Sequence, residues 1–239
     1  MLADSQSQYS RGAFPDAIHL PKTARYELFG FIVGELPKWR DNPNRPATYS
    51  ETELTSGLCA HLSTATRFSE AWSRIQFSTE PPDELKRGRK IDLAPRSLGT
   101  IYIEGRRFTE YDLLFPIECK RLPMPSPNDK KRDEREYVIN AYGSTGGIQR
   151  FKEGNHGAAH DFAGMIGYVQ DATGFRKWFQ TINSWIDELV SQSDKDWSED
   201  DQLTQLTEDT ESRTCQCRSN HERAGRNPIE LWHAWVNLC

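Results

Sequence analysis

The chain has 239 residues, of which 36% are hydrophobic and 27% are charged, and its formal net charge at pH 7 is -5. This length is sufficient for one α/β domain with a substantial core. Five cysteines without framework spacing indicate a reducing compartment. Neither a run of about 18 apolar residues nor a signal-peptide pattern is present. We therefore expect a cytoplasmic protein that does not cross a membrane.

The first half of the chain is expected to contain two helices followed by strands. Residues 1–47 are rich in proline, glycine and polar residues, so we expect an N-terminal arm with one short helix. Ser50 and Glu53 have the spacing of a capping box, and leucines recur at helical intervals after them, which predicts a helix over residues 51–66. Alternating side chains predict a strand within residues 72–80.

Three β-rich segments follow, separated by glycine, proline and charged turns, and we expect them to form adjacent strands of one sheet. They span residues 89–96, 100–105 and 111–122. Charged residues from Lys130 onward lead into a helical stretch that is broken at residues 143–147 and then resumes.

The second half continues the α/β pattern. Residues 163–171 form an apolar run of strand length, and the apolar residues within 175–190 fall on one helical stripe. Residues 229–238 predict a last strand. The chain is thereby divided into an arm, an α/β core, an acidic linker and a C-terminal segment whose final strand packs on the core. These parts are residues 1–47, 48–190, 191–212 and 213–239.

The charges are unevenly distributed along the chain. Residues 187–212 contain ten acidic residues and one lysine, whereas residues 86–152 contain fifteen lysines and arginines against nine acidic residues. Polyanions bind through lysine and arginine, so the basic segment is where an anionic partner is expected to bind. The acidic stretch 191–212 has little to bury, and we expect it to be a flexible linker.

The basic segment also contains the candidate catalytic residues. Alternate residues of a strand face the same side, so Glu118 and Lys120 project together while Cys119 points to the opposite face. Their strand is otherwise apolar, where charged residues are costly unless they are paired or bound to an ion. Asp92 lies in another of the β-rich segments. Two carboxylates on neighbouring strands are oxygen ligands suited to Mg²⁺.

Asp92 followed by Glu118-Cys119-Lys120 resembles the signature of the PD-(D/E)XK, or restriction-endonuclease-like, nucleases. The predicted elements within residues 50–190 are similar in order to the αβββαβ core of that superfamily. The resemblance implies an α/β fold with a central mixed sheet flanked by helices. Ile91 stands where the motif has its proline, and the distance from Asp92 to Glu118 requires an inserted strand. Asp112 is an alternative acid, less natural because it lies in the same segment as Glu118.

The resemblance implies a metal-dependent nuclease that hydrolyses phosphodiester bonds of DNA. Asp92 and Glu118 would hold Mg²⁺ or Mn²⁺, and Lys120 would position the attacking water. Such nucleases, often endonucleases, act in restriction, repair or antiphage defence beside a helicase or ATPase, and this chain has no phosphate-binding loop of its own. The alternative is a nuclease fold that serves as a nucleic-acid-binding or sensor subunit without independent cleavage. A purely structural protein is a third possibility.

Further site residues are also implied by the resemblance. Members often carry an additional acid on the first helix, and Glu51 is favoured because it shares the face of the leucines, whereas Glu53 belongs to the capping box. Gln149 resembles a residue that these nucleases place on the helix after the E-x-K strand. Tyr137 is a further candidate phosphate contact. The basic residues expected to bind nucleic acid are Arg87, Arg89, Lys90, Arg121 and Arg150.

The remaining cysteines and histidines have simpler interpretations. Cys215-x-Cys217 followed by His221 lacks the second pair that a closed zinc site needs, so we expect free cysteines in a mobile loop. His156 and His160 lie in glycine-rich surroundings and are expected in a loop near the site. His233 alternates with apolar residues, which is typical of a hydrogen-bonded core histidine.

Overall fold

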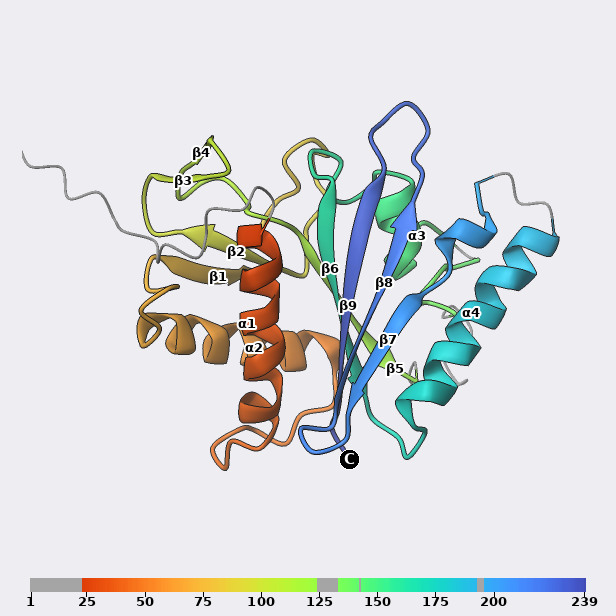
Figure 1. The fold of residues 1–239 in the computed structure, drawn as a ribbon, viewed down its shortest axis with the longest axis horizontal. Helices are drawn as coiled ribbons and strands as arrows, with labels where there is room; N and C mark the ends of the chain where they lie inside the picture. The colour runs from red at the N-terminus through yellow and green to blue at the C-terminus, as the bar shows by residue number, and fades with distance from the viewer. Residues whose placement is uncertain (1–22, 124–132, 142, 193–195) are drawn as a thin grey trace, which may run out of the picture.

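The computed structural model describes residues 23–123, 133–141, 143–192 and 196–239. Seven strands form one mixed sheet of order β1-β2-β5-β6-β9-β8-β7, and two further strands pair separately as β3-β4 (Figure 1). The strands are β1 (Ile75–Thr79), β2 (Leu93–Ser97), β3 (Ile101–Ile103), β4 (Arg106–Phe108), β5 (Ile117–Leu122), β6 (Phe162–Val169), β7 (Thr204–Asp209), β8 (Thr214–His221) and β9 (Ile229–Asn237).

The sheet is mixed because its two halves are joined by parallel strands. Strands β1, β2 and β5 are successively antiparallel, and so are β7, β8 and β9. Between these groups, β6 runs parallel to both β5 and β9. The expected α/β fold with a mixed central sheet is therefore present.

Helices cover both faces of this sheet. They are α1 (Thr23–Arg40), α2 (Glu51–Arg67), α3 (Gly147–Lys152), α4 (Phe175–Ser191) and the 3-10 turn η2 (Glu199–Asp201). Every residue of β6 is buried, as expected for a strand between two helical layers. Its Ile166 and Tyr168 join the core beneath α1 and α2, while Met165 and Val169 join the core beneath α4. Figure 1 shows α1 and α2 on one side and α4 on the other.

Helix α1 is longer than the short helix expected in the N-terminal arm. It spans 18 residues, and its Leu28, Phe29 and Ile32 are completely or almost completely buried, so burial against the sheet stabilises it. No helix among the described residues is long and apolar enough to cross a lipid bilayer.

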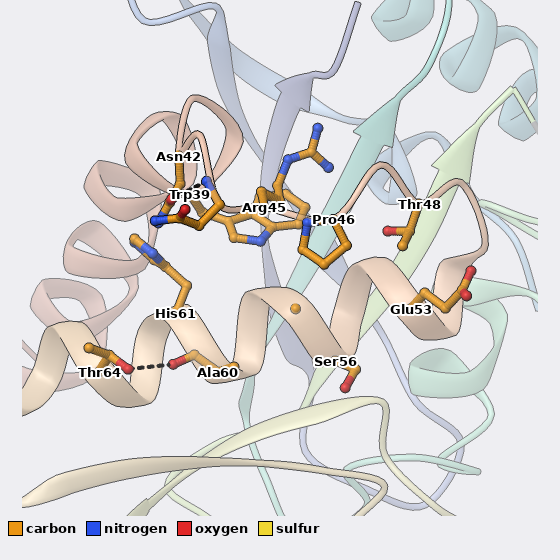
Figure 2. Close-up of a pocket in the computed structure, with 12 residues that line it drawn as sticks. Trp39, Asn42, Arg45, Pro46, Thr48, Glu53, Ser56, Ala60, His61 and Thr64 are labelled. Atoms are coloured by element: carbon orange, nitrogen blue, oxygen red, sulfur yellow. Dashed lines mark hydrogen bonds between the residues drawn. The ribbon is translucent and has the colours of Figure 1, made fainter.

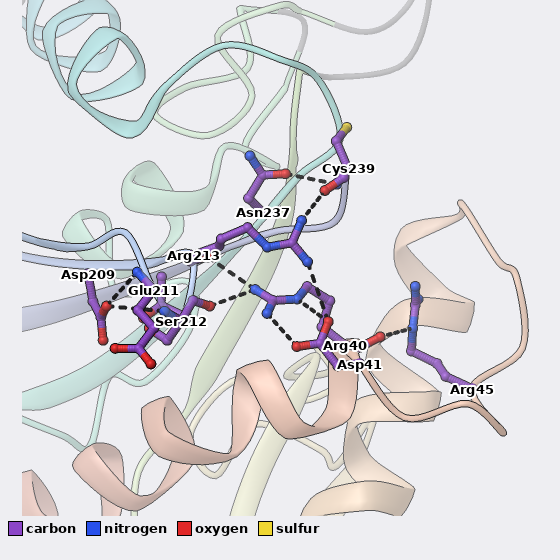
Figure 3. Close-up of polar contacts among 10 residues, drawn as sticks. Arg40, Asp41, Arg45, Asp209, Glu211, Ser212, Arg213, Asn237 and Cys239 are labelled. Atoms are coloured by element: carbon purple, nitrogen blue, oxygen red, sulfur yellow. Dashed lines mark hydrogen bonds and ion pairs between the residues drawn. The ribbon is translucent and has the colours of Figure 1, made fainter.

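The C-terminal end of α1 is tied to the last two strands by arginines (Figure 3). Arg40 Nη1 donates to Ser212 O at 2.6 Å, and Arg40 Nη2 lies 2.5 Å from Asp41 Oδ2. Arg213 Nη2 reaches Asp41 Oδ1 at 3.4 Å, and Arg213 Nη1 donates to the backbone of Cys239. These bonds join the β7-β8 turn and the last residue of the chain to α1.

Three expectations about the strands and loops are wrong. The segment 100–105 supplies β3, which pairs with β4 in a separate hairpin rather than with the central sheet. Residues 134–138 form turns rather than a helix. Cys215 and Cys217 lie buried in β8 rather than in a mobile loop. Local β propensity does not specify which strand is the partner, so these differences depend on tertiary packing.

The expectation of a flexible acidic linker is wrong where the structure describes it. Residues 199–209 contain η2 and β7, and Trp197 and Leu203 are buried in the core beneath α4. Most side chains of β7 remain exposed, because it is the last strand of the sheet. An edge strand can carry many acidic residues since they stay in water.

A continuous set of buried polar side chains joins α3 to the sheet. Lys152 Nζ lies 2.8 Å from Asp201 Oδ1, and His221 Nδ1 lies 2.6 Å from the same oxygen. Ser219 Oγ is bonded to His221 Nε2 at 2.7 Å and to His233 Nε2 at 2.8 Å. Burial lowers the pKa of His233 to about 3. His233 is therefore a neutral, hydrogen-bonded core histidine, as predicted.

Candidate active site

The register of β2 and β5 brings the two central acids together. The strands share one residue pair, Leu93 with Ile117, and continuing this antiparallel register by one residue places Asp92 opposite Glu118. The strands separate at this point, and the backbone N–H of Cys119 donates to Asp92 Oδ2 at 2.9 Å. The Asp92 side chain thus takes the place of a ladder acceptor.

Glu118 and Lys120 lie on one face of β5, as the strand period predicts. Lys120 Nζ is 3.0 Å from Glu118 Oε1. Cys119 points to the opposite face and packs in the core beneath α1 and α2. Glu118 is 0% exposed and Lys120 is 2% exposed, so both charges depend on protein partners rather than on water.

Glu118 has two further cationic or proton-donating partners. Arg150 Nη1 donates to Glu118 Oε1, and His156 Nδ1 lies 3.1 Å from Glu118 Oε2. Burial by itself raises the pKa of Glu118, but Lys120, the His156 hydrogen bond and Arg150 outweigh burial and hold the pKa well below its usual range. Glu118 is consequently an ionised carboxylate inside the protein.

Lys120 is surrounded by acids from three parts of the chain. Its Nζ lies 3.2 Å from Glu51 Oε1, at the first residue of α2, and 4.0 Å from Glu136 Oε1. Burial by itself lowers the pKa of Lys120, but the charges of Glu118, Glu51 and Asp92 raise it above its usual range. Lys120 is therefore held as an ammonium. Glu51 Oε2 is buried and has no hydrogen-bond partner in the part of the chain that the structure describes.

Asp92 differs from Glu118 in its protonation state. Burial and the nearby charge of Glu118 raise the pKa of Asp92 to about 8, against the opposing effects of Lys120 and the Cys119 N–H. The site thus combines one ionised carboxylate with one carboxyl that is largely protonated at neutral pH, which is the usual outcome for two close acids.

Some predicted site residues do not reach this cluster. Gln149 donates to Glu153 Oε1 at 2.8 Å and accepts from the Asn140 N–H at 3.2 Å. The alternative acid Asp112 bonds to Thr109. The suggestion that Tyr137 contacts phosphate is wrong, because its ring is completely buried and its hydroxyl bonds to core side chains.

Of the basic residues predicted to bind nucleic acid, Arg150 bonds to a carboxylate of the cluster, whereas three others bond to residues outside it. Arg89 Nη2 donates to Ser144 Oγ at 3.3 Å, and Lys90 Nζ lies 2.5 Å from Glu80 Oε2. Arg121 Nη1 donates to Tyr49 O at 2.8 Å. Arg87 is exposed.

Two contributors to the cluster were not identified as site residues from the sequence. Glu136 comes from a turn and lies beside Lys120, and no periodic pattern surrounds it. His156 belongs to the loop between α3 and β6, where a loop near the site was expected, but its contact with Glu118 was not. Arg150 was expected to meet phosphate, whereas it meets Glu118.

Two hollows in the described part of the chain lie outside this cluster. One, of about 570 Å³, lies between the loop after α1 and the side of α2 that carries Glu53 and His61, with Trp39 and Pro46 opposite (Figure 2). The other, of about 650 Å³, adjoins Gln149 and Lys152 at the end of α3. Neither hollow is lined by Asp92, Glu118 or Lys120.

The described residues contain no group of three or more His, Cys, Asp or Glu side chains arranged to hold a metal ion. Asp92 and Glu118 still offer two coupled carboxylates, and Glu51 offers a buried oxygen without a hydrogen bond. Such an oxygen donor set fits Mg²⁺ or Mn²⁺, which share their coordination with water and phosphate.

Comparisons of the chain with protein-family models, curated proteins and solved structures gave no match. The function is therefore inferred from the site itself.

The contrast between Glu51 and Glu53 gives a prediction. Glu53 belongs to the N-terminal cap of α2, where Ser50 Oγ accepts from the Glu53 N–H at 3.2 Å and donates to the Glu53 carboxylate. Replacing Glu53 by Ala is expected to lower the stability by on the order of 1 kcal/mol or less without changing the nuclease activity that the sequence resemblance implies. Replacing Glu51 by Ala is expected to reduce activity with a small change in stability. Melting temperatures and cleavage rates of both variants test this, and a catalytically dead Glu53→Ala protein would contradict it.

Proposed function

We propose that this protein is a metal-dependent nuclease of the PD-(D/E)XK class that hydrolyses phosphodiester bonds of DNA. The observation that carries the proposal is the β2-β5 register, which puts Asp92 opposite Glu118 while Lys120 shares the face of Glu118. Buried ionisable side chains whose pKa values are shifted by close charged neighbours mark a candidate functional site.

The order of elements also supports a restriction-endonuclease-like core. Helix α2 is followed by β1, β2, β5, α3 and β6, which corresponds to the αβββαβ order once the β3-β4 hairpin is treated as an insertion. Asp92 directly precedes the second strand of this series, and Glu118 and Lys120 lie in the third. These are the positions that the motif occupies in that arrangement.

Asp92 and Glu118 would hold the metal ion, with Glu51 assisting. Bound Mg²⁺ or Mn²⁺ would polarise the phosphoryl group and lower the pKa of a coordinated water. Asp92 must lose its proton to become a ligand, so metal affinity should rise with pH up to about 8. Glu118 is already ionised.

Lys120 supplies the fixed positive charge of the site. Its carboxylate neighbours hold the ammonium in place and keep it protonated. Such an ammonium can orient the attacking water by a hydrogen bond and stabilise the charge that develops on the phosphate in the transition state. Preorganised charge of this kind acts with little reorganisation during the reaction.

The distribution of charge supports a nucleic-acid substrate. The basic segment 86–152 contains the site and has six more cationic than acidic residues, which favours a polyanion. We propose an endonuclease of restriction, repair or antiphage defence that acts with a helicase or ATPase partner in the cytoplasm.

One observation favours a second candidate function. Glu118 is closed off by Lys120, Arg150 and His156, so the site as it stands offers a metal few free oxygens. A nuclease fold that binds or senses nucleic acid without cutting it would tolerate this arrangement.

Supercoiled plasmid incubated with the purified protein separates the two candidates. Nicked or linear product in Mg²⁺ or Mn²⁺, and none in EDTA, is the result expected for the nuclease. Retarded migration of DNA without new ends would favour the binding subunit. Neither cleavage nor binding would contradict both.

A further inference from the structure

The three partners of Glu118 differ in their freedom to move. The side chains of Lys120 and His156 are 3% and 2% exposed, whereas that of Arg150 is 16% exposed. Lys120 is also held by Glu51 at 3.2 Å. Arg150 is therefore the partner of Glu118 that can leave at the lowest cost.

The guanidinium of Arg150 is weakly anchored apart from this contact. Its hydrogen bond within the described residues goes to Glu118, and its Nε is buried without a hydrogen-bond partner. A guanidinium normally uses several of its five N–H groups when it has a purely structural role. The Nε–H of Arg150 is therefore available to a further acceptor.

The backbone that carries Arg150 is fixed, so any movement is confined to the side chain. A Cβ on Gly146 would lie 2.4 Å from Ile139 Cα, and one on Gly147 would lie 2.7 Å from both Met165 Cε and Tyr137 O. Helix α3 thus begins in direct contact with its neighbours. Rotation of the arginine side chain requires no movement of α3.

We propose that Arg150 substitutes for the metal ion in the free protein and binds the substrate phosphate once the ion is bound. The proposal rests on the proposed function. Glu118 Oε1 already contacts Lys120 Nζ at 3.0 Å and accepts from Arg150 Nη1, so a divalent cation bound to this oxygen would take the place of one of them. Arg150 is the less buried of the two. A displaced guanidinium fits a phosphate group, to which it can donate two parallel hydrogen bonds.

This exchange explains why a buried acid cluster is tolerated without a metal. Glu118 and Glu51 both pair with Lys120, and one ammonium does not offset two carboxylates. Arg150 supplies the missing positive charge until a metal ion does so. Metal binding and DNA binding are thereby coupled, since the ion releases the group that contacts phosphate.

Replacing Arg150 by Gln tests the exchange by calorimetric titration of the full chain with Mn²⁺ in the absence of DNA. The affinity for Mn²⁺ is expected to become at least about tenfold tighter, because a competing charge is removed. The matched control is Arg121→Gln, which also removes one positive charge, from β5, but does not change the contacts of Glu118. It should shift the Mn²⁺ affinity much less. DNA binding is measured with Ca²⁺ present. The slope of the logarithm of the DNA affinity against the logarithm of the salt concentration should become shallower by about 1 in Arg150→Gln.

Arg150→Lys provides a second arm that retains the charge. It is expected to keep the Mn²⁺ affinity within about threefold of the parent protein and to bind DNA more weakly, since an ammonium lacks the two-pronged contact. The proposed exchange would be overturned if Arg150→Gln bound Mn²⁺ no more tightly than the parent protein, or if Arg121→Gln shifted the Mn²⁺ affinity equally. Either result would leave the proposed function standing. A parent protein that binds no Mn²⁺ and leaves DNA intact would overturn the proposed function with it.

Discussion

Replacing Lys120 by Met is expected to lower single-turnover cleavage at saturating DNA by on the order of a hundredfold to a thousandfold, while DNA binding persists. The ammonium would act on the attacking water and on charge that develops only in the transition state. Met retains much of the length and the apolar stem. Because Lys120 is almost completely buried beside Glu118, the variant should also lose stability, on the order of 3 kcal/mol.

Lys152→Met is the matched control for this loss of stability. Lys152 is 7% exposed and pairs with a buried acid, Asp201, at 2.8 Å, but it lies outside the acid cluster. Its replacement should destabilise the fold to a similar extent and leave the cleavage rate of the folded protein unchanged. Rates are measured per folded molecule, with folding followed by circular dichroism. Equal cleavage by Lys120→Met and its parent would exclude the catalytic role of Lys120.

Asp92→Asn and Glu118→Gln are expected to change stability in opposite directions at neutral pH, although both should abolish the proposed cleavage. The folded protein keeps Asp92 protonated up to about pH 8, whereas an unfolded Asp ionises near pH 4. Between these two pH values the unfolded chain releases a proton that the folded chain retains. The free energy of unfolding of the parent protein therefore falls by up to about 1.4 kcal/mol for each unit by which the pH rises. Asn does not ionise, so this loss disappears.

Glu118 follows the opposite sign. Its folded pKa lies below the usual range, so its ionisation stabilises the fold above the unfolded value near 4.3 and ceases to do so as the pH falls. Glu118→Gln leaves Lys120 and Arg150 without their shared carboxylate, which should cost on the order of 3 kcal/mol at pH 7.

Melting temperatures from pH 5 to pH 8 distinguish the two acids. The stability advantage of Asp92→Asn over the parent should grow with pH through this range. Glu118→Gln should melt below the parent throughout. Two variants that shift in the same direction at pH 7 would show that the assigned protonation states are wrong.

The sequence by itself determined the features that depend on backbone periodicity. Glu118 and Lys120 share a face because strand side chains alternate. Ser50 caps helix α2 because the side chain of an N-cap residue can bond the backbone N–H three residues later, which is that of Glu53. The stripe of α4 was evident for the same reason. In each case the interacting groups lie within a few residues, so the local geometry is sufficient.

Only the tertiary structure decided which distant residues complete the site. Arg150 and His156 reach Glu118 across more than thirty residues, and Glu136 approaches Lys120 from a turn without any sequence pattern. The pairing of β3 with β4 and the strand β7 at the sheet edge likewise depend on which partners remain available after the core has packed. The protonation states of Asp92 and Glu118 follow from burial and from these long-range neighbours. Sequence spacing specifies neither the strand partners nor the neighbours that set these protonation states. The packing of the whole fold sets the distance between segments that are far apart in the chain.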